Sequence, residues 1–356
     1  MSGYDAALKI VEDAIASRIF PAAAIEVGDS RGPGWSDGLG RLSFAADARP
    51  ASIDTPFDLA SLTKPMATAT LAMELVQAGA LRLDEPVRSF FDDWRGADRE
   101  AVTVRDLLEH ASGLPARLVD APPGTRREFE HDIGVIALEY PPRSASIYSD
   151  LGFILLGFLI ADRGRRPLAG QFDRFASRLR LGGDLLAFEV PPAQRELTAR
   201  TMPMDEDARR GRVLAGEVHD NYAAALGGAA GHAGLFGTAP AVGAFARAVL
   251  QTIAGDPALA QPATFREFIR RTAIPGSSRA LGWDTMLPTS SCGTLLSSTA
   301  IGHTGFTGTS LWIDWERDLY IVLLTNRVHP TRDNERIRAL RPRFHDAVVQ
   351  SLITNH

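Results

Sequence analysis

Strand-like segments lie near both ends of the chain, and the segments between them are mostly helical. Short β-like pieces at 22–29 and 40–46 are separated by a turn that contains glycine and proline, which predicts a hairpin. The period of two returns in 300–326, which predicts two or three antiparallel strands with a turn at 314–318. Strands at both ends with helices between them indicate that the two ends share one sheet.

We therefore predict an α+β fold in which an antiparallel sheet flanked by helices is joined to a mostly helical second domain. Residues 1–58 and 275–356 would form the discontinuous sheet domain, residues 59–274 the helical domain, and the active site would lie at their interface. The local signals behind this division are a helix from Ser61 that ends at Gly79, a helix at 103–115 capped by Thr103, a buried helix at 151–161, a last helix at 333–353, and loop-rich intervals at 115–130 and 182–232.

Composition excludes several classes of partner. The 356 residues carry a net charge of −5, with 45% hydrophobic and 23% charged residues, and this balance provides no basic field that would attract nucleic acid or an anionic membrane. The longest apolar run, 151–161, is shorter than the ~20 residues of a membrane-spanning helix. Charged residues interrupt the first 20 residues, so no secretory signal is visible. We expect a cytoplasmic protein, or a periplasmic or secreted one if the chain has been trimmed.

Lysine is scarce in this chain, which makes Lys64 informative. Of the 38 basic residues, 36 are arginine, and only Lys9 and Lys64 are lysine. Lysine can lose its proton and act as a base, whereas arginine cannot. Ser61 precedes Lys64 by three residues, a spacing that places both on one face of a helix. At a helix start, free N–H groups can hold an oxyanion and the dipole favours a neutral Lys64, so the pair fits a nucleophile and its base. A capping serine beside a chance lysine is the structural alternative.

Tyr148 and Asp150 form a second candidate pair directly before the buried helix. They are two residues apart, so in an extended segment they project to the same side. Nearby cations would favour the phenolate form of Tyr148, which could then move a proton to or from a neighbouring group. Alternatively, Ser149 or Asp150 only caps the following helix.

The segment 302–310 is a predicted strand that contains several glycines. Its glycines remove side chains at points where a ligand could approach the backbone. His303 and Thr304 would present a donor and a hydroxyl group to an acyl substrate, and Gly305 would leave room for it. A glycine-rich strand corner that binds nothing is the structural alternative.

These three groups occur in the order and approximate separation of the motifs of the serine β-lactamase and penicillin-binding-protein superfamily. The sequence resembles the class C-like branch, which includes D,D-peptidases, D-aminopeptidases and esterases. The likeness extends over nearly the whole chain, and the segments that carry it are FDLASLTKPMAT, LRLDEPV, TVRDLLEHASGLP, IYSDLGFILLG, GHAGLFGTAPAVGAFARAVL, GHTGFTGTSLWID and YIVLLTN.

By this resemblance the chain has a β-lactamase/transpeptidase-like fold, and no metal or organic cofactor is implied. Ser61 would be the acylated nucleophile, Lys64 its partner base, and Tyr148 would exchange protons during acylation and deacylation. The backbone N–H groups of Ser61 and Phe306 would form the oxyanion hole. The other residues expected at the substrate are Asp150, His303, Thr304 and Gly305.

Two positions depart from the family pattern. His303 stands where class C β-lactamases usually carry lysine, so a permanent cation is replaced by a group that can be neutral at pH 7, and recognition of a substrate carboxylate is weakened. Histidine at this point is seen in relatives that act on D-amino-acid amides and esters. Asp150 stands where asparagine is common, and a carboxylate there can pair with Lys64 but repels an anionic ligand.

Other residues offer competing sites. Ser36 lies in a Gly-x-Ser-x-Gly segment like the nucleophile elbow of α/β-hydrolases, but a turn precedes it and a strand-like segment follows it, whereas the elbow joins a strand to a helix. His219, Asp220 and His232 could hold a metal, yet their spacing matches no compact zinc motif, and we expect them to shape a loop beside the cleft. Cys292 is the only cysteine, which excludes an internal disulfide, and its neighbours include no base.

The sequence therefore predicts a serine hydrolase that cleaves a small-molecule ester, amide or lactam through an acyl-enzyme on Ser61. An esterase or a D-amino-acid-specific peptidase is the leading activity, with slow β-lactam hydrolysis as a side activity. The alternatives are a true class C-type β-lactamase and a non-catalytic penicillin-binding-type sensor. Retention of both Ser61 and Lys64 in a lysine-poor chain weighs against the sensor. The natural acyl group and the oligomeric state do not follow from the sequence.

Overall fold

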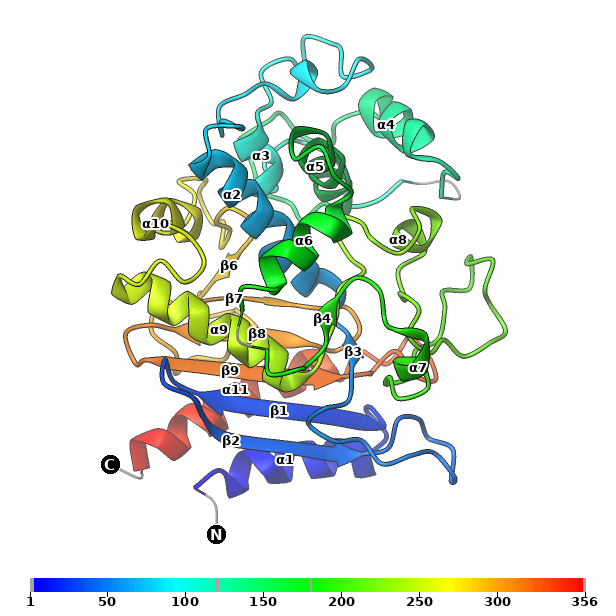
Figure 1. Ribbon diagram of the computed structural model, residues 1–356, viewed down its shortest axis with the longest axis vertical. Helices are drawn as coiled ribbons and strands as arrows, with labels where there is room; N and C mark the ends of the chain where they lie inside the picture. Colours follow the sequence, from blue (N-terminus) through cyan, green and yellow to red (C-terminus); the bar gives the residue numbers. More distant parts are fainter. Residues whose placement is uncertain (1–2, 119–121, 180, 355–356) are drawn as a thin grey trace.

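One antiparallel sheet joins the two ends of the chain. The computed structural model describes residues 3–118, 122–179 and 181–354. The strands of the sheet are β1 (Ala22–Gly28), β2 (Pro33–Gly40), β6 (Asp284–Thr285), β7 (Ile301–Thr304), β8 (Ser310–Asp314) and β9 (Leu319–Thr325). Their order is β2-β1-β9-β8-β7-β6 (Figure 1), and Ala24 of β1 lies opposite Leu324 of β9. The predicted α+β fold with a shared antiparallel sheet is confirmed.

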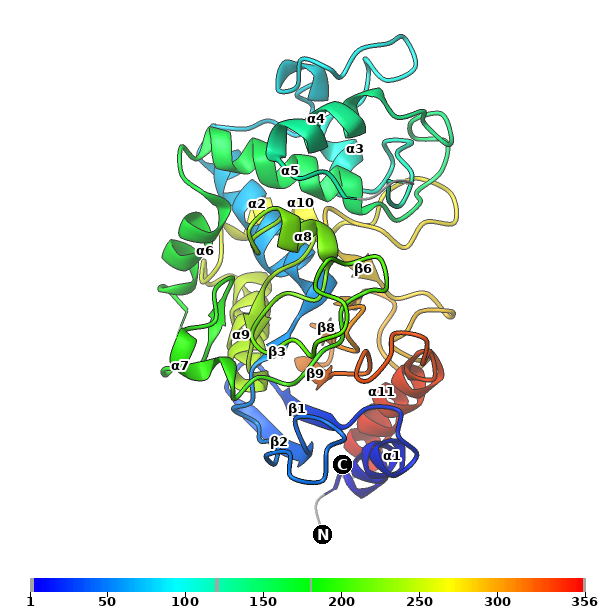
Figure 2. The ribbon, with the colours of Figure 1, turned by 90° about the vertical axis from the view of Figure 1, so that its right-hand side faces the viewer.

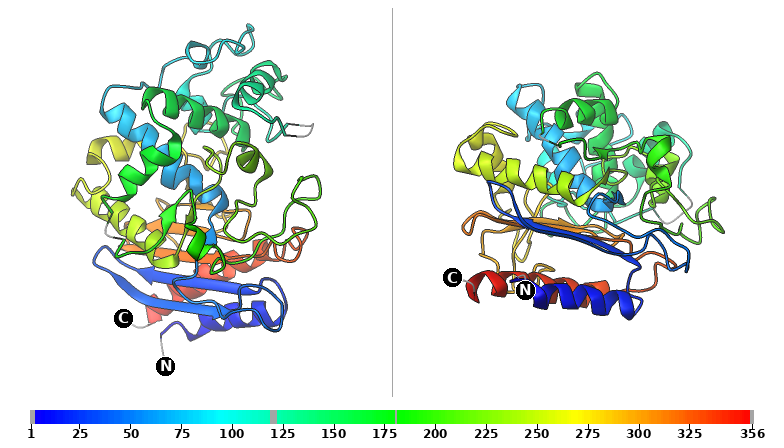
Figure 3. Two further views of the ribbon diagram at one scale, coloured as in Figure 1. Left: turned by 45° about the vertical axis from the view of Figure 1, so that its right-hand side comes forward. Right: turned by 60° about the horizontal axis from the view of Figure 1, so that its bottom comes forward.

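Helices cover both faces of this sheet. They are α1 (Asp5–Ala16), α9 (Ala239–Ala254) and α11 (Ile337–Thr354). Helices α1 and α11 lie on one face and α9 lies on the other (Figure 3). Neighbouring residues of β9 point to opposite faces: Ile321 clusters with Val11 and Phe344 of the first two helices, and Val322 clusters with Phe245 of α9. Strand β9 is buried throughout because both of its faces are covered.

A layer of helices lies on the α9 side of the sheet (Figure 2). It contains α2 (Thr70–Gln77), α3 (Val104–Leu108), α4 (Arg126–Val135), α5 (Asp150–Arg163), α6 (Leu168–Ala176), α7 (Pro192–Arg195), α8 (Asn221–Ala225) and α10 (Pro262–Ile269). Helix α5 is buried from its first residue to Ile160 and packs against α2, α3 and α6. The caps predicted from the sequence are present, since Thr103 forms a capping box with Asp106 and Gly79 has φ +68°.

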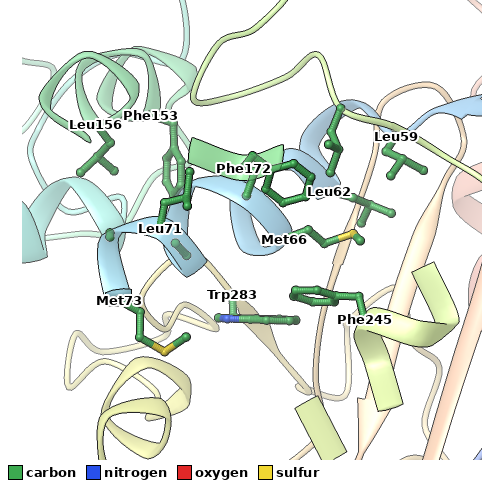
Figure 4. Close-up of a cluster of buried hydrophobic side chains, with 14 of the residues drawn as sticks. Leu59, Leu62, Met66, Leu71, Met73, Phe153, Leu156, Phe172, Phe245 and Trp283 are labelled. Carbon is green, nitrogen blue, oxygen red and sulfur yellow. The ribbon is translucent and has the colours of Figure 1, made fainter. Parts of the chain in front are cut away.

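The core of the helical layer is continuous with the core above the sheet. Phe153 of α5 and Phe172 of α6 lie in one buried cluster with Phe245 and Trp283, whose rings stack with centroids 6.3 Å apart (Figure 4). A second, three-stranded sheet has the order β3-β5-β4, with strands β3 (Phe57–Asp58), β5 (Phe236–Gly237) and β4 (Leu186–Ala187). Strand β3 therefore fixes the segment that leads into Ser61 to parts of the chain far away in sequence.

The sequence prediction placed the second strand of the hairpin in the wrong segment. The strand after β1 is β2 (Pro33–Gly40), which occupies the segment predicted as the turn, and residues 41–46 are irregular. Strand β2 lies at the edge of the sheet, and a glycine within a strand often marks a close approach of another backbone. A side chain at Gly38 would collide with Ser52 and come within 2.6 Å of the backbone N of Ile53. The glycine therefore reflects a close tertiary approach rather than a turn.

The helix predicted from Ser61 also begins differently. A 3₁₀ turn spans Ala60–Leu62, a π-helical segment spans Lys64–Ala69, and regular α-helix begins only at Thr70. π-helical turns inside helices are rare overall, and those that occur are often at functional sites. A second short 3₁₀ turn lies at Val87–Ser89.

The division into two domains at residues 58 and 275 stays a prediction. Helix α9 comes from the segment assigned to the helical domain, and it packs on the sheet. In the predicted loop interval 115–130, α4 already begins at Arg126, and residues 119–121 lie outside the described part. Among the helices that the structure describes, none has the length and apolar character needed to cross a membrane.

A substitution at Leu156 tests the packing of α5. Its side chain is fully buried in the main core, so we expect Leu156→Ala to destabilise the protein by about 2–5 kcal/mol, through lost burial and a cavity. Urea unfolding followed by circular dichroism measures the change. Leu197→Ala is the control, because Leu197 is 42% exposed. Equal unfolding midpoints for the two variants would contradict this packing.

Candidate active site

The residues predicted to form a site surround one cavity. It has a volume of about 370 Å³ and is lined by β7, the first turns of α11 and the segment that precedes α5. Lys64 lies next to the cavity with no exposed surface. The predicted residues that line the cavity are Ser61, Tyr148, Asp150, His303, Thr304, Gly305 and Phe306. The structure therefore brings all eight predicted residues together, while their chemical roles stay predictions.

Lys64 lies close to the hydroxyl of Ser61. Ser61 is in the 3₁₀ turn Ala60–Leu62, and Lys64 is the first residue of the π-helical segment that follows. The Nζ of Lys64 lies 3.2 Å from the Oγ of Ser61. The sequence spacing thus predicted the contact, although the two residues lie where a 3₁₀ turn meets a π-helical segment rather than in the expected α-helix.

Ala60, directly before Ser61, has a strained backbone. Its φ of +48° falls in the left-handed region that residues other than glycine rarely adopt. Asp58 accepts a hydrogen bond from its N–H at 2.8 Å, and the hydroxyl of Thr63 donates to its carbonyl at 2.6 Å. Burial raises the pKa of Asp58 to about 6. Sequence analysis missed Asp58, because no local pattern marks a carboxylate that holds a neighbouring backbone.

The contacts of Lys64 favour its ammonium form. Its Nζ donates to Asp150 Oδ1 at 2.8 Å, to the carbonyl oxygen of His232 at 3.0 Å and to Ser61. Burial lowers the pKa of Lys64, but Asp150 and Tyr148 raise it, and the pKa ends above its usual value. The expectation that the helix dipole makes Lys64 neutral is therefore wrong, because the adjacent carboxylate outweighs it.

Tyr148 completes the contacts of Ser61. Its hydroxyl lies 2.6 Å from Ser61 Oγ, and Lys64 Nζ lies 4.7 Å from the centre of its ring. Burial and Asp150 raise the pKa of Tyr148, Lys64 lowers it in part, and the net direction is upward. The hydroxyl of Ser149 accepts from the N–H of Gly152 and caps α5. This cap lies between Tyr148 and Asp150 in the sequence, so capping and the proposed chemistry coexist.

A chain of alternating charges extends from Lys64 into the cavity wall. Arg117 donates to Asp150 Oδ2 at 3.1 Å and to Asp220 Oδ2 at 2.9 Å. The Nε2 of His232 lies 2.7 Å from Asp220 Oδ1. Burial raises the pKa of Asp150, but Lys64, His232 and Arg117 lower it more, so Asp150 is ionised. Sequence analysis missed Arg117, which lies in a loop without any motif.

His303 presents a neutral ring to the cavity. Its Nδ1 donates to the carbonyl oxygen of Thr304 at 2.8 Å, which leaves Nε2 as the acceptor. Burial, Arg279 and Lys64 hold the pKa of His303 well below its usual value. Arg279, which sequence analysis also missed, places its guanidinium 5.4 Å from the centre of the Tyr148 ring. The strand position thus carries no charge, and the guanidinium of Arg279 reaches the cavity from a loop.

The competing sites do not gather a second set of reactive groups. His219 lines the same cavity and lies against Phe306, with ring centroids 5.7 Å apart, and burial lowers its pKa to about 4. Within the described residues, no three His, Cys, Asp or Glu side chains are grouped as metal ligands. Ser36 is exposed on β2. Cys292 is buried, and burial raises its pKa to about 12.

The sequence is similar to known proteins over most of its length. The family model described as Beta-lactamase matches residues 9–343. A relative named Putative D-alanyl-D-alanine carboxypeptidase, from Salmonella gallinarum (strain 287/91 / NCTC 13346), is 31% identical over 324 residues, which cover 81% of this chain and 73% of the relative.

Two solved structures show that the fold is of the β-lactamase/transpeptidase type. Beta-Lactamase/D-Alanine Carboxypeptidase from Pseudomonas syringae has a TM-score of 0.74 at 18% identity, over 97% of this chain and 99% of that chain. EstCE1, described as a hydrolase with promiscuous acyltransferase activity, has a TM-score of 0.73 at 19% identity, over 97% of this chain and 98% of that chain.

A substitution at Asp150 tests how its carboxylate affects the pKa of Lys64. Asp150→Asn removes the carboxylate that raises the pKa of Lys64, while burial, which lowers it, remains. We therefore expect the rising limb of kcat/KM against pH, measured with an uncharged ester, to move to lower pH. Asp162→Asn is the control, because Asp162 is in the same helix and its side chain is 53% exposed. A limb that stays in place or moves to higher pH would contradict the assignment.

A substitution at Gly305 tests the close approach of this residue to Leu59 and Thr309. An added Cβ would lie 2.6 Å from the carbonyl oxygen of Leu59 and would collide with the hydroxyl of Thr309. Because small misplacements of a site are costly, we expect Gly305→Ala to lower kcat/KM for an activated ester by about 10–100-fold. Gly32→Ala, where the added atom meets open space, is the control. Steady-state kinetics of both variants measure the effect, and equal values would show that the approach is not needed.

Proposed function

The chain belongs to the Beta-lactamase family, and from that premise we propose that it is a serine hydrolase that cleaves an ester or amide bond through an acyl-enzyme on Ser61. One observation carries the proposal. The Oγ of Ser61 lies within hydrogen-bonding distance of both Lys64 Nζ, at 3.2 Å, and Tyr148 OH, at 2.6 Å, at the wall of a cavity. A serine hydroxyl becomes a good nucleophile when such neighbours take its proton.

Acylation would use Lys64 and Tyr148 as one coupled pair. Both side chains hold their protons at neutral pH, and the pair gains a base when it loses one proton. The ammonium of Lys64 then stabilises the phenolate of Tyr148, which takes the proton of Ser61 as Oγ bonds to the substrate carbonyl carbon. The bond to the leaving group breaks, and Tyr148 returns the proton to the departing alcohol or amine.

Deacylation would repeat these steps with water. The pair takes a proton from water as the water oxygen bonds to the acyl carbon. The pair then gives this proton to Ser61 Oγ as the ester bond breaks. In both steps the carbonyl oxygen carries negative charge, which the N–H groups of Ser61 and Phe306 would stabilise. The residues Asp150, His303, Thr304 and Gly305 would contact or orient the substrate. No step requires a metal or an organic cofactor.

Small esters and peptides that end in D-residues are the proposed substrate classes. The 31% identical relative named as a D-alanyl-D-alanine carboxypeptidase supports the peptidase, and the neutral His303 disfavours a β-lactamase that depends on a cation at this strand position. A class C-type β-lactamase and a non-catalytic sensor remain the alternatives. The net charge of −5 disfavours nucleic acid as a partner, and the cytoplasmic location stays a prediction.

Intact-mass spectrometry tests the acyl-enzyme directly. Wild type and Ser61→Ala would be exposed to an activated ester, a penicillin and a D-alanyl dipeptide, and product release would be followed in parallel. We expect an adduct of acyl mass on wild type alone and turnover of at least the ester. An adduct without turnover of any of the three would favour the sensor. The absence of both an adduct and turnover would refute the proposal.

Ser36→Ala separates the two candidate nucleophiles. Because Ser36 is exposed on β2 and outside the cavity, we expect its loss to leave ester hydrolysis unchanged. Ser61→Ala should lower kcat by about 10⁴-fold or more, as expected for the loss of an activated nucleophile. The reverse pattern, measured in the same assay, would move the nucleophile to Ser36.

A further inference from the structure

Two buried arginines hold the turn that carries the proposed oxyanion donor. This turn, residues 305–309, connects β7 to β8 and is called the oxyanion turn below. The Nη2 of Arg341, on α11, donates to the carbonyl oxygens of Gly305 at 2.7 Å and Thr309 at 2.8 Å. The Nε of Arg327 donates to the carbonyl oxygen of Phe306 at 2.7 Å. Arg341 is 7% exposed and Arg327 is 4% exposed.

The contact at Gly305 bears directly on the N–H of Phe306. The carbonyl of Gly305 and the N–H of Phe306 belong to one trans peptide unit, so they are coplanar and point in opposite directions. A guanidinium that holds the oxygen therefore also fixes the direction of the N–H. A cation on the oxygen in addition polarises the amide, which strengthens the N–H as a donor.

Arg341 is a buried cation without a carboxylate partner in the described part of the chain. Its Nε has no hydrogen-bond partner there, and its neighbours Arg327 and Arg338 repel it. Burial and these neighbours lower its pKa to about 9, which still leaves it charged at neutral pH. Burying an unpaired charge is costly. The hydrogen bonds of Arg341 to the carbonyl oxygens of Gly305 and Thr309 offset part of this cost.

The oxyanion turn is also tied to the backbone that leads into Ser61. The hydroxyl of Thr307 donates to the carbonyl oxygen of Asp58 at 2.7 Å, and that of Thr309 donates to the carbonyl oxygen of Leu59 at 3.0 Å. The two proposed N–H donors, on Ser61 and Phe306, thus belong to one hydrogen-bonded unit. Arg341 and Arg327 are the charged groups that hold this unit, through the carbonyl oxygens of the oxyanion turn.

We propose that Arg341 is a positioning residue that aims and polarises the N–H of Phe306 toward the oxyanion, through its hydrogen bond to the carbonyl of Gly305. The inference rests on the proposed function, because an oxyanion exists only if Ser61 attacks a carbonyl. Although Arg341 lines the cavity, the role proposed for it runs through the peptide unit of Gly305 and Phe306 rather than through a contact with the substrate. Removal of Arg341 should therefore reduce the stabilisation of the transition state and leave the binding of the substrate in its ground state unchanged.

Arg341→Met tests this role, with Arg341→Lys as the conservative variant and Arg343→Met as the control. Arg343 lies two residues further along α11 and is exposed. The measurements are kcat and KM for p-nitrophenyl acetate and the inhibition constant of phenylboronic acid, which forms a tetrahedral anionic adduct on a serine. For Arg341→Met we expect kcat to fall about 10–100-fold and boronate affinity to fall by a similar factor. KM should stay within about twofold, Arg341→Lys should recover part of the loss, and Arg343→Met should match wild type.

Thermal unfolding of each variant separates positioning from folding. A folded Arg341→Met with wild-type kcat and boronate affinity would overturn the inference. If Arg341→Met does not fold, Arg341→Lys decides: a loss confined to kcat and boronate affinity supports the role, and a change in KM or melting temperature alone overturns it. A wild-type protein without any Ser61-dependent adduct or turnover would refute the proposed function itself, which is a distinct result.

Discussion

A fully buried ammonium, that of Lys64, is the charge on which the rest of the site depends. An unpaired cation without water is costly, so Lys64 requires acceptors. It finds them on Asp150, on the carbonyl of His232 and on Ser61, which belong to three separate parts of the chain. Compensating this one charge therefore requires α5, the loop at His232 and the 3₁₀ turn to be assembled together. The same contacts place Tyr148 against Ser61.

Features set by local sequence could be predicted. The period of two in 300–326 gave β7, β8 and β9, and Thr103 gave a helix cap, because strand pairing and capping leave a pattern within a few residues. The spacing of Ser61 and Lys64 predicted their contact for the same reason. Their meeting with Tyr148 and residues 303–306 followed from the family resemblance rather than from any local pattern.

Features set by tertiary contacts could not be predicted. Gly38 looked like a turn residue, and only the approach of Ser52 explains why it stands in an edge strand. The ionised state of Lys64 depends on a carboxylate 86 residues away, so the local helix dipole gave the wrong answer. Arg117 and Arg279 reach the cavity from irregular segments, where sequence carries no period that would reveal the direction of a side chain.

The strain at Ala60 and the position of the oxyanion turn have one physical basis. A left-handed alanine persists only where its surroundings hold it. Here the carbonyls of Asp58 and Leu59, directly before it, accept hydrogen bonds from Thr307 and Thr309 of the oxyanion turn. The contacts that hold the strained backbone are thus the contacts that fix one N–H donor relative to the other. Relaxing Ala60 would require the oxyanion turn to move, so the geometry that stabilises an oxyanion is established by folding, before any substrate binds.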